Sequence, residues 1–181
     1  NNEVYNVIKK LIENNEWNWI INLHPKMDAE IVQKFKQLEQ YDNVTYIPFL
    51  DSLLPLKNAD VLIADTSSII TEFMIQEKPV VTFNNNKPFD YFINTLEAKD
   101  LEKNIRLALS KPKELMDKIS VFINNEHPYF DGKSSERIIS ASLDFLNSKT
   151  NTKLKKKPLN LIRKFKMRKK FNYFKNFFKS N

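Results

Sequence analysis

Short apolar segments alternate with amphipathic segments along most of the chain, and this alternation constrains the fold more than any other feature. The apolar segments are continuous, which is typical of parallel strands buried on both faces. The segments between them repeat apolar residues at intervals of three and four, as amphipathic helices do. We expect strands at residues 17–23, 44–47, 61–64 and 79–83, a loop at 84–95, and helices at 4–12, 28–40, 50–56, 67–76, 96–109, 115–122 and 134–146. The pattern predicts an α/β fold, a Rossmann-like parallel sheet flanked by helices.

The formal net charge of +7 is the sum of two unlike regions. The chain has 29 basic and 22 acidic residues, and 13 of the basic ones lie from Lys149 onward, after the last acidic residue, Asp144. This leaves 16 basic and 22 acidic residues in 1–148, a balance of −6. We therefore predict a Rossmann-like domain over 1–148 and a basic, aromatic-rich, amphipathic helical tail over 149–181.

Several kinds of site are excluded by composition. The chain has no cysteine, which excludes disulfides and thiolate metal sites, and its single glycine excludes a glycine-rich phosphate loop. No Asp-x-Asp pair offers a clamp for a divalent metal, so we expect neither a metal nor a cofactor. No apolar run approaches the roughly 18 residues of a membrane span.

A sheet of only four strands, in a chain that begins at Asn1, suggests a fragment of a longer two-domain protein.

The segment at 61–83 carries the most chemical information. An apolar strand runs directly into Asp65, Thr66, Ser67 and Ser68, and a helix follows. Ligands of open parallel sheets bind outside the carboxyl ends of the strands, where helix N–H groups and hydroxyls can hold a phosphate. The alternative is that Asp65, Thr66 and Ser67 only cap the helix, which is common.

Two further side chains are candidates near this edge. Glu72 lies one helical turn after Ser68 and can accept hydrogen bonds from ribose hydroxyls, although an exposed helical glutamate is the ordinary alternative. His24 ends the first strand at the same edge, if the strands are parallel. Its pKa range suits proton transfer or phosphate contact near neutral pH, but a lone histidine is more often structural.

A third candidate element surrounds the only glycine of the chain. Gly132 is followed by Lys133 and Ser134 at a predicted helix start, and Arg137 lies within the first turn. These residues form either a second helix start that faces an anion or a turn and N-cap on a surface helix.

Taken together, these segments resemble the C-terminal, nucleotide-binding domain of the CDP-glycerol glycerophosphotransferase family, which has the GT-B fold. The resemblance covers about residues 4–146 and rests on five segments in the same order and spacing: LHP at 23–25, VTYIP at 44–48, ADTSSIITEF at 64–73, KPVVTF at 78–83 and FDGKSSERI at 130–138.

The resemblance implies a function in teichoic-acid or capsule polysaccharide biosynthesis. A CDP-alcohol such as CDP-glycerol would be the donor, held by the Rossmann-like domain, and a lipid-linked or polysaccharide hydroxyl would attack its β-phosphorus as CMP leaves. Thr66, Ser67 and Ser68 would bind the diphosphate, and His24 would act near the transferred phosphate. We expect this chain to bind the donor without turning it over alone, as a peripheral protein on the cytoplasmic face of a bacterial cell membrane.

The tail interleaves basic clusters with large apolar side chains. Met167, Phe171, Phe174 and Phe178 follow one another at helical spacing and form one stripe. We expect this tail to lie on an anionic membrane, with nucleic acid and a solvated disordered tail as the alternatives. The residues predicted to bind the membrane are Lys156, Arg163, Lys169, Phe171, Phe174 and Phe178.

Two other functions stay open. A strand-end phosphate site of this kind would look similar in a GT-B glycosyltransferase or epimerase that uses a nucleotide sugar. A nucleic-acid-binding protein on a Rossmann-like scaffold is the other alternative, although we expect no nucleic-acid partner.

Overall fold

The computed structural model describes residues 2–48, 53–148 and 158–171. The packing of the chain separates it into two compact units, residues 1–130 and 131–181. From the change in charge, we expected the boundary at 148/149. The boundary between the two units lies earlier, before the helix predicted at 134–146. The elements in chain order are α1 (Asn2–Glu13), β1 (Trp19–Ile21), α2 (Ala29–Lys36), η1 (Gln37–Gln40), β2 (Val44–Tyr46), α3 (Leu53–Asn58), β3 (Leu62–Ala64), α4 (Ile69–Met74), β4 (Val80–Phe83), β5 (Ile93–Thr95), η3 (Ala98–Asp100), α5 (Leu101–Leu109), α6 (Lys113–Glu126), α7 (Ser134–Asn147) and α8 (Leu161–Lys170).

The strands of the first unit are all parallel and form two small sheets. β1 pairs with β2, with Trp19 beside Val44. β4 lies between β3 and β5, with Ala64 beside Thr82 and Thr82 beside Asn94. Since every pair is parallel, the carboxyl ends of paired strands meet at the same edge.

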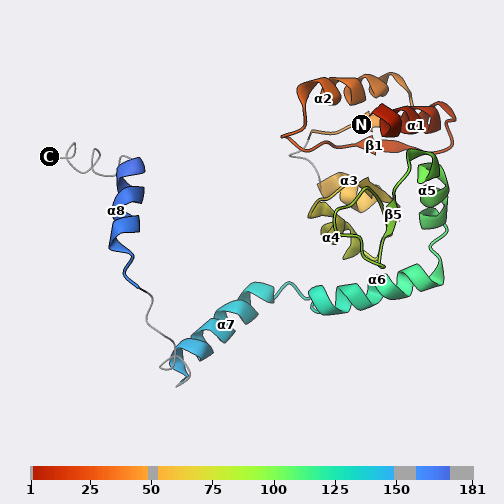
Figure 1. Cartoon of the computed structure of the whole chain (residues 1–181). Helices are drawn as coiled ribbons and strands as arrows, with labels where there is room; N and C mark the ends of the chain where they lie inside the picture. Colours follow the sequence, from red (N-terminus) through yellow and green to blue (C-terminus); the bar gives the residue numbers. More distant parts are fainter. Residues whose placement is uncertain (1, 49–52, 149–157, 172–181) are drawn as a thin grey trace. The chain divides into compact units, whose positions relative to one another are not determined.

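Both faces of the three-stranded sheet are covered, because neighbouring strand residues point to opposite faces. Val80 packs in a core with residues of α3, α4 and α6, including Phe73 and Ile119, while Val81 packs with α1 and α5, including Leu101. Figure 1 shows α3 and α4 on one side of β5 and α5 on the other. The predicted fold class is therefore confirmed: parallel sheets flanked by helices, as in a Rossmann-like half of a GT-B fold.

Helix α1 connects the two sheets. Its neighbouring residues Leu11 and Ile12 are both buried, but Leu11 packs in the core of the three-stranded sheet and Ile12 in the core of β1 and β2. Trp19 of β1 also packs against both cores. Shared packing of this kind makes the two sheets parts of one unit.

The prediction of four strands was wrong, because the described residues contain a fifth. β5 lies inside the segment that we expected to be a loop. It is only three residues long and contains Asn94, a residue type with a low preference for strands. It forms because the buried strand β4 offers it a ladder of backbone hydrogen bonds, a tertiary effect that a local pattern does not show.

Helix boundaries also differ from the predicted ones. The helix predicted at 67–76 is shorter, Ile69–Met74, and the helix predicted from residue 96 begins at Leu101, after the short η3. Other predicted features are present: Asp28 caps α2 through a hydrogen bond from the Glu30 N–H, and α7 begins at Ser134.

In the part of the chain that the structure describes, no helix has the length and apolar character needed to cross a membrane.

Candidate functional site

Polar residues line one edge of the three-stranded sheet, at the carboxyl ends of β3 and β4. Asp65, Thr66, Ser67 and Ser68 follow β3, and all four are exposed. Residues 84–87 follow β4, which is the direct neighbour of β3. We call residues 65–68 and 84–87 the β3–β4 edge. It has the position at which open parallel sheets bind their ligands.

Two hydrogen bonds join the two halves of this edge. The side-chain amide of Asn85 donates from Nδ2 to the carbonyl oxygen of Asp65 at 2.8 Å. The backbone N–H of Asn86 donates to the Thr66 hydroxyl at 3.3 Å. The loop after β4 therefore holds the loop after β3, and Thr66 uses one of its two acceptor lone pairs inside the protein.

A hydrogen-bond network that begins inside the sheet holds the backbone of Asn85 in place. Thr82 is fully buried in β4, and its hydroxyl donates to Oδ1 of Asn94 in β5 at 2.9 Å. The same oxygen accepts the Asn85 N–H at 3.0 Å. The Asn85 Oδ1 in turn accepts the Lys87 N–H at 2.8 Å. Because buried polar groups are costly unless paired, this network sets the path of the chain as it leaves β4.

Sequence reasoning missed the three residues of this network. Asn94 lies on the strand that was not predicted, and Thr82 and Asn85 were read only as parts of a strand and a loop. A usable signal was present, since Thr82 is a polar residue inside an otherwise apolar strand that is buried on both faces. The three consecutive asparagines at 84–86 were a second signal, because asparagine tolerates a positive φ better than most residues, and Asn84 has a φ of 48°.

The hydroxyl residues before α4 have different local roles. Ser67 Oγ accepts the N–H of Ile69 at 3.4 Å, so the capping role that we kept as an alternative applies at least to this residue. Ser68 precedes the first helical residue and its side chain makes no capping bond. The helix has only six residues, so its dipole adds less than the ten-residue helix expected from the sequence would. Glu72 is exposed on this helix, one turn after Ser68.

His24 lies after β1, on the other sheet. It is exposed, and its Nδ1 accepts the Lys26 N–H at 3.1 Å, so the neutral imidazole carries its proton on Nε2. The neighbouring Asn22 donates to the carbonyl oxygens of Ile47 and Pro48 at 3.0 and 3.1 Å, and thereby ties the end of β1 to the end of β2. Among the hydrogen bonds of the described residues, none connects this edge with the β3–β4 edge.

The segment around Gly132 lies in the second unit. Gly132 has a φ of +72°, and the Asp131 carboxylate accepts the Lys133 N–H at 3.0 Å, which closes a tight turn. Arg137 forms a bidentate hydrogen-bonded ion pair with the same carboxylate, and this pair holds the pKa of Asp131 well below its usual range. The turn that we kept as an alternative is therefore present. A phosphate role for Gly132, Lys133, Ser134 and Arg137 stays a prediction.

The loop after β4 also contributes aromatic side chains to a second surface, which it shares with α6. The rings of Phe89 and Tyr91 stack at 4.9 Å, and Tyr91 stacks on Phe122 of α6 at 4.4 Å. They line a hollow of about 630 Å³. Partial burial and the nearby carboxylate of Glu126 raise the pKa of Tyr91 above its ordinary value.

No metal site is evident in the described part of the chain, where no three histidine or acidic side chains are placed to hold an ion together. The expectation that this protein needs neither a metal nor a cofactor stays a prediction.

Comparison with known proteins points to one family. The family model described as UDP-N-acetylglucosamine 2-epimerase matches residues 1–142. The curated UDP-N-acetylglucosamine 2-epimerase of Methanocaldococcus jannaschii is 23% identical over 129 residues, which are 66% of this chain and 33% of that protein. The chain thus spans about a third of the length of the curated relative that it matches. No solved structure matches the chain.

These matches overturn the resemblance to the CDP-glycerol glycerophosphotransferases. The family assignment was wrong, and with it the transfer of a phospho-polyol, the transferase class, the CDP-alcohol donor and the link to teichoic acid and capsule polysaccharide. Four of the five resembling segments cover strands of the parallel sheets or the residues that directly follow a strand, which a Rossmann-like half uses whatever nucleotide it binds, and the fifth covers the start of α7. The epimerase that we kept as an alternative agrees with the matches.

Proposed function

Because the chain belongs to the UDP-N-acetylglucosamine 2-epimerase family, we propose that it is the nucleotide-binding part of an enzyme that acts on a UDP-sugar. The β3–β4 edge binds the diphosphate of this ligand in our proposal. UDP-N-acetylglucosamine is the first ligand to test, since both matches carry that name.

The observation that carries this proposal is the pair of hydrogen bonds that join the two loops of the β3–β4 edge. The Asn85–Asp65 and Asn86–Thr66 hydrogen bonds hold two loops together at the carboxyl ends of adjacent parallel strands. The hydroxyls of Thr66, Ser67 and Ser68 are exposed there, and no acidic side chain other than Asp65 lies within residues 65–68 or 84–87. Hydroxyl and amide donors on a fixed backbone, with Lys87 as the one basic side chain of this edge, suit a diphosphate, because they can donate hydrogen bonds to its charged oxygens.

A direct binding experiment tests the proposal. UDP, UDP-N-acetylglucosamine, CDP and CDP-glycerol are each titrated into the chain by isothermal calorimetry. We expect the two uridine ligands to bind and the two cytidine ligands to bind at least ten-fold more weakly. Equal binding of UDP and CDP, or no binding of either, would contradict the proposal.

A pair of variants locates the ligand. Thr66→Val removes a hydroxyl of the β3–β4 edge, and we expect it to weaken UDP binding roughly ten-fold, since one hydrogen bond to a charged group is worth about 1.5 kcal/mol or more. Thr45→Val is the matched control, because Thr45 is an exposed threonine within β2. Equal affinities of the two variants would place the ligand elsewhere.

His24 remains the candidate for proton transfer in this enzyme. It lies exposed after β1, and a histidine can take or give a proton near neutral pH. In a protein that interconverts the sugar epimers, His24→Gln is expected to lower kcat about 100-fold or more and to change the affinity for UDP less than three-fold. An unchanged kcat would remove His24 from the reaction. Glu72 is the corresponding candidate for the ribose hydroxyls, and Glu72→Gln is expected to weaken UDP more than it weakens inorganic diphosphate.

A further inference from the structure

We propose that helix α8, with the two residues before it and Phe171 after it, binds the surface of an anionic membrane. This inference does not depend on the proposed function, since α8 belongs to the second unit and lies beyond the residues that the family model matches.

The charge of α8 is entirely of one sign. Six of its ten residues are basic and none is acidic, and the basic residues are Arg163, Lys164, Lys166, Arg168, Lys169 and Lys170. Such a helix does not neutralise its own charge, so it is attracted to a surface with many negative groups. Near an anionic membrane, each basic residue contributes about a five-fold gain in binding.

Apolar side chains are exposed on the same short segment. Leu159, Leu161 and Ile162 are 68%, 66% and 75% exposed, and Phe165 and Phe171 are also exposed. No residue of α8 is buried. Exposed apolar groups that lie together in this way usually mark a surface that binds something.

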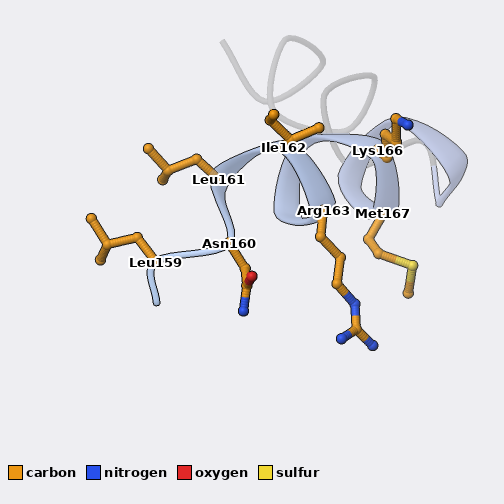
Figure 2. A pocket seen from close by; sticks show the side chains of 7 residues that line it. All are labelled: Leu159, Asn160, Leu161, Ile162, Arg163, Lys166 and Met167. Atoms are coloured by element: carbon orange, nitrogen blue, oxygen red, sulfur yellow. The ribbon is translucent and has the colours of Figure 1, made fainter. Parts of the chain in front are cut away.

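The geometry of the helix mixes the two kinds of side chain. Leu161, Ile162 and Phe165 fall within about 100° of the helix circumference, at 100° per residue. Figure 2 shows Ile162 and Lys166 on one side of the helix, and Arg163 and Met167 on the other. Each of these basic side chains thus lies one turn from an apolar one. Long basic side chains beside apolar ones can reach the lipid headgroups while their neighbours enter the acyl region.

A lipid surface fits these residues better than a nucleic acid does. Proteins that bind single strands stack bases on aromatic rings, whereas four of the six apolar residues at 159–171 are leucine, isoleucine or methionine. Aliphatic side chains offer bases no stacking surface, but they gain free energy when they enter the membrane interface. A membrane would also stabilise the helix, since a ten-residue helix without buried side chains is marginal in water.

The experiment is co-sedimentation of the whole chain with lipid vesicles. We expect binding to vesicles that contain 30% phosphatidylglycerol and at least 50-fold weaker binding to pure phosphatidylcholine. Arg163→Gln/Lys166→Gln/Lys170→Gln should weaken binding about 100-fold, from about five-fold for each residue. Leu161→Gln/Ile162→Gln should weaken it at least ten-fold without any change of charge.

Matched variants on the first unit serve as controls. Lys36→Gln/Lys103→Gln/Lys113→Gln removes the same charge, and Leu107→Gln/Val121→Gln removes two exposed apolar residues from α5 and α6. Both controls should bind vesicles as the natural chain does. Controls that weaken binding as much as the α8 variants would overturn the proposal. A nucleic-acid site would also overturn the proposal. Its signs would be tighter binding to a single-stranded RNA 20-mer than to the vesicles, and normal binding of that RNA by Leu161→Gln/Ile162→Gln.

The residues of the predicted aromatic stripe are only partly covered by this proposal. Met167 and Phe171 are described and exposed, whereas Phe174 and Phe178 lie outside the described residues. Lys156, which was also predicted to bind the membrane, lies outside them as well. The site proposed here is therefore restricted to residues 159–171.

Discussion

The side-chain amide of Asn85 donates to the backbone carbonyl of Asp65 at 2.8 Å, and this bond joins the end of β4 to the end of β3. Asn85 is placed by its own backbone N–H, which Asn94 accepts, and Asn94 also accepts from the buried Thr82. The geometry of an exposed edge is thus determined by a network inside the sheet.

Asn85→Ala should affect both stability and ligand binding. The variant loses the bond to Asp65 and the bond that its Oδ1 accepts from Lys87, which costs about 1–2 kcal/mol of unfolding free energy. UDP affinity should fall roughly ten-fold because the loop that carries Thr66 is less restrained. Asn86→Ala is the control, since Asn86 contributes its backbone N–H, which alanine keeps. Equal loss of UDP affinity in both variants would argue against the bridging role of Asn85.

Thr82→Val should destabilise the fold although it keeps the size and shape of the side chain. Thr82 is fully buried, and the variant removes one of the two donors to Asn94 Oδ1. We expect a loss of about 1 kcal/mol in urea unfolding. Thr45→Val, at an exposed position of β2, should change stability by less than 0.5 kcal/mol, roughly the effect of an ordinary surface substitution. Unchanged stability of Thr82→Val would show that the network does not determine the fold here.

Lys78→Met should lower stability through loss of a helix cap. The Lys78 ammonium donates to the carbonyl oxygens of Leu56 and Lys57 at the end of α3, at 3.0 and 2.6 Å. We expect a loss of about 1 kcal/mol, since the side chain is only partly buried. Lys87→Met, at an exposed loop position, is the comparison variant for thermal unfolding, and it should leave the melting temperature unchanged.

Glu16 and Arg106 should make stability depend on pH. Arg106 holds both oxygens of Glu16 at 2.7 and 2.6 Å, and this hydrogen bonding lowers the pKa of Glu16. A lowered carboxyl pKa contributes stability above the unfolded value of about 4.3, and this contribution is lost as the pH falls through the lower folded value. The natural chain should therefore melt higher than Glu16→Gln at pH 7, and the difference should shrink as the pH falls below about 4.3.

Two further measurements check the origin of this effect. Because both side chains are about half exposed, 1 M salt should reduce the difference at pH 7. In an Arg106→Gln background, Glu16→Gln should change the melting temperature at pH 7 less than it does in the natural chain, because the carboxylate has then lost its guanidinium partner. A difference between the natural chain and Glu16→Gln that keeps the same size from pH 7 to pH 3 would mean that packing, rather than charge, is responsible.

Glu77→Gly should stabilise the protein. Glu77 has a φ of +57° just after α4, a conformation that costs a non-glycine residue about 1 kcal/mol or more. Part of this gain is offset by the greater flexibility of glycine in the unfolded chain, so we expect a net increase of about 0.5 kcal/mol. Gln76→Gly, at the preceding position, does not relieve a positive φ and should destabilise the protein in the same chemical denaturation experiment.

The α/β class could be predicted because it depends on local patterns. Continuous apolar strands such as β4 are stable only with helices on both faces, and the capping carboxylate of Asp28 marks the start of α2 within a few residues. The concentration of basic residues after Lys149 is likewise a property of the sequence alone. The family, in contrast, was predicted incorrectly from segments at strand ends, because such segments indicate a nucleotide-binding edge and not which nucleotide it binds.

By itself, the sequence determined which segments must be buried and therefore the layers of the fold. Only the tertiary structure decided that residues 93–95 form a strand, and that Asn85 and Thr82 support the edge at Thr66. The physical reason is the distance along the chain over which each kind of interaction acts. A hydrophobic period is visible over about ten neighbouring residues, whereas the Asn85–Asp65 bond joins groups that are 20 residues apart and meet only after β3 and β4 have paired.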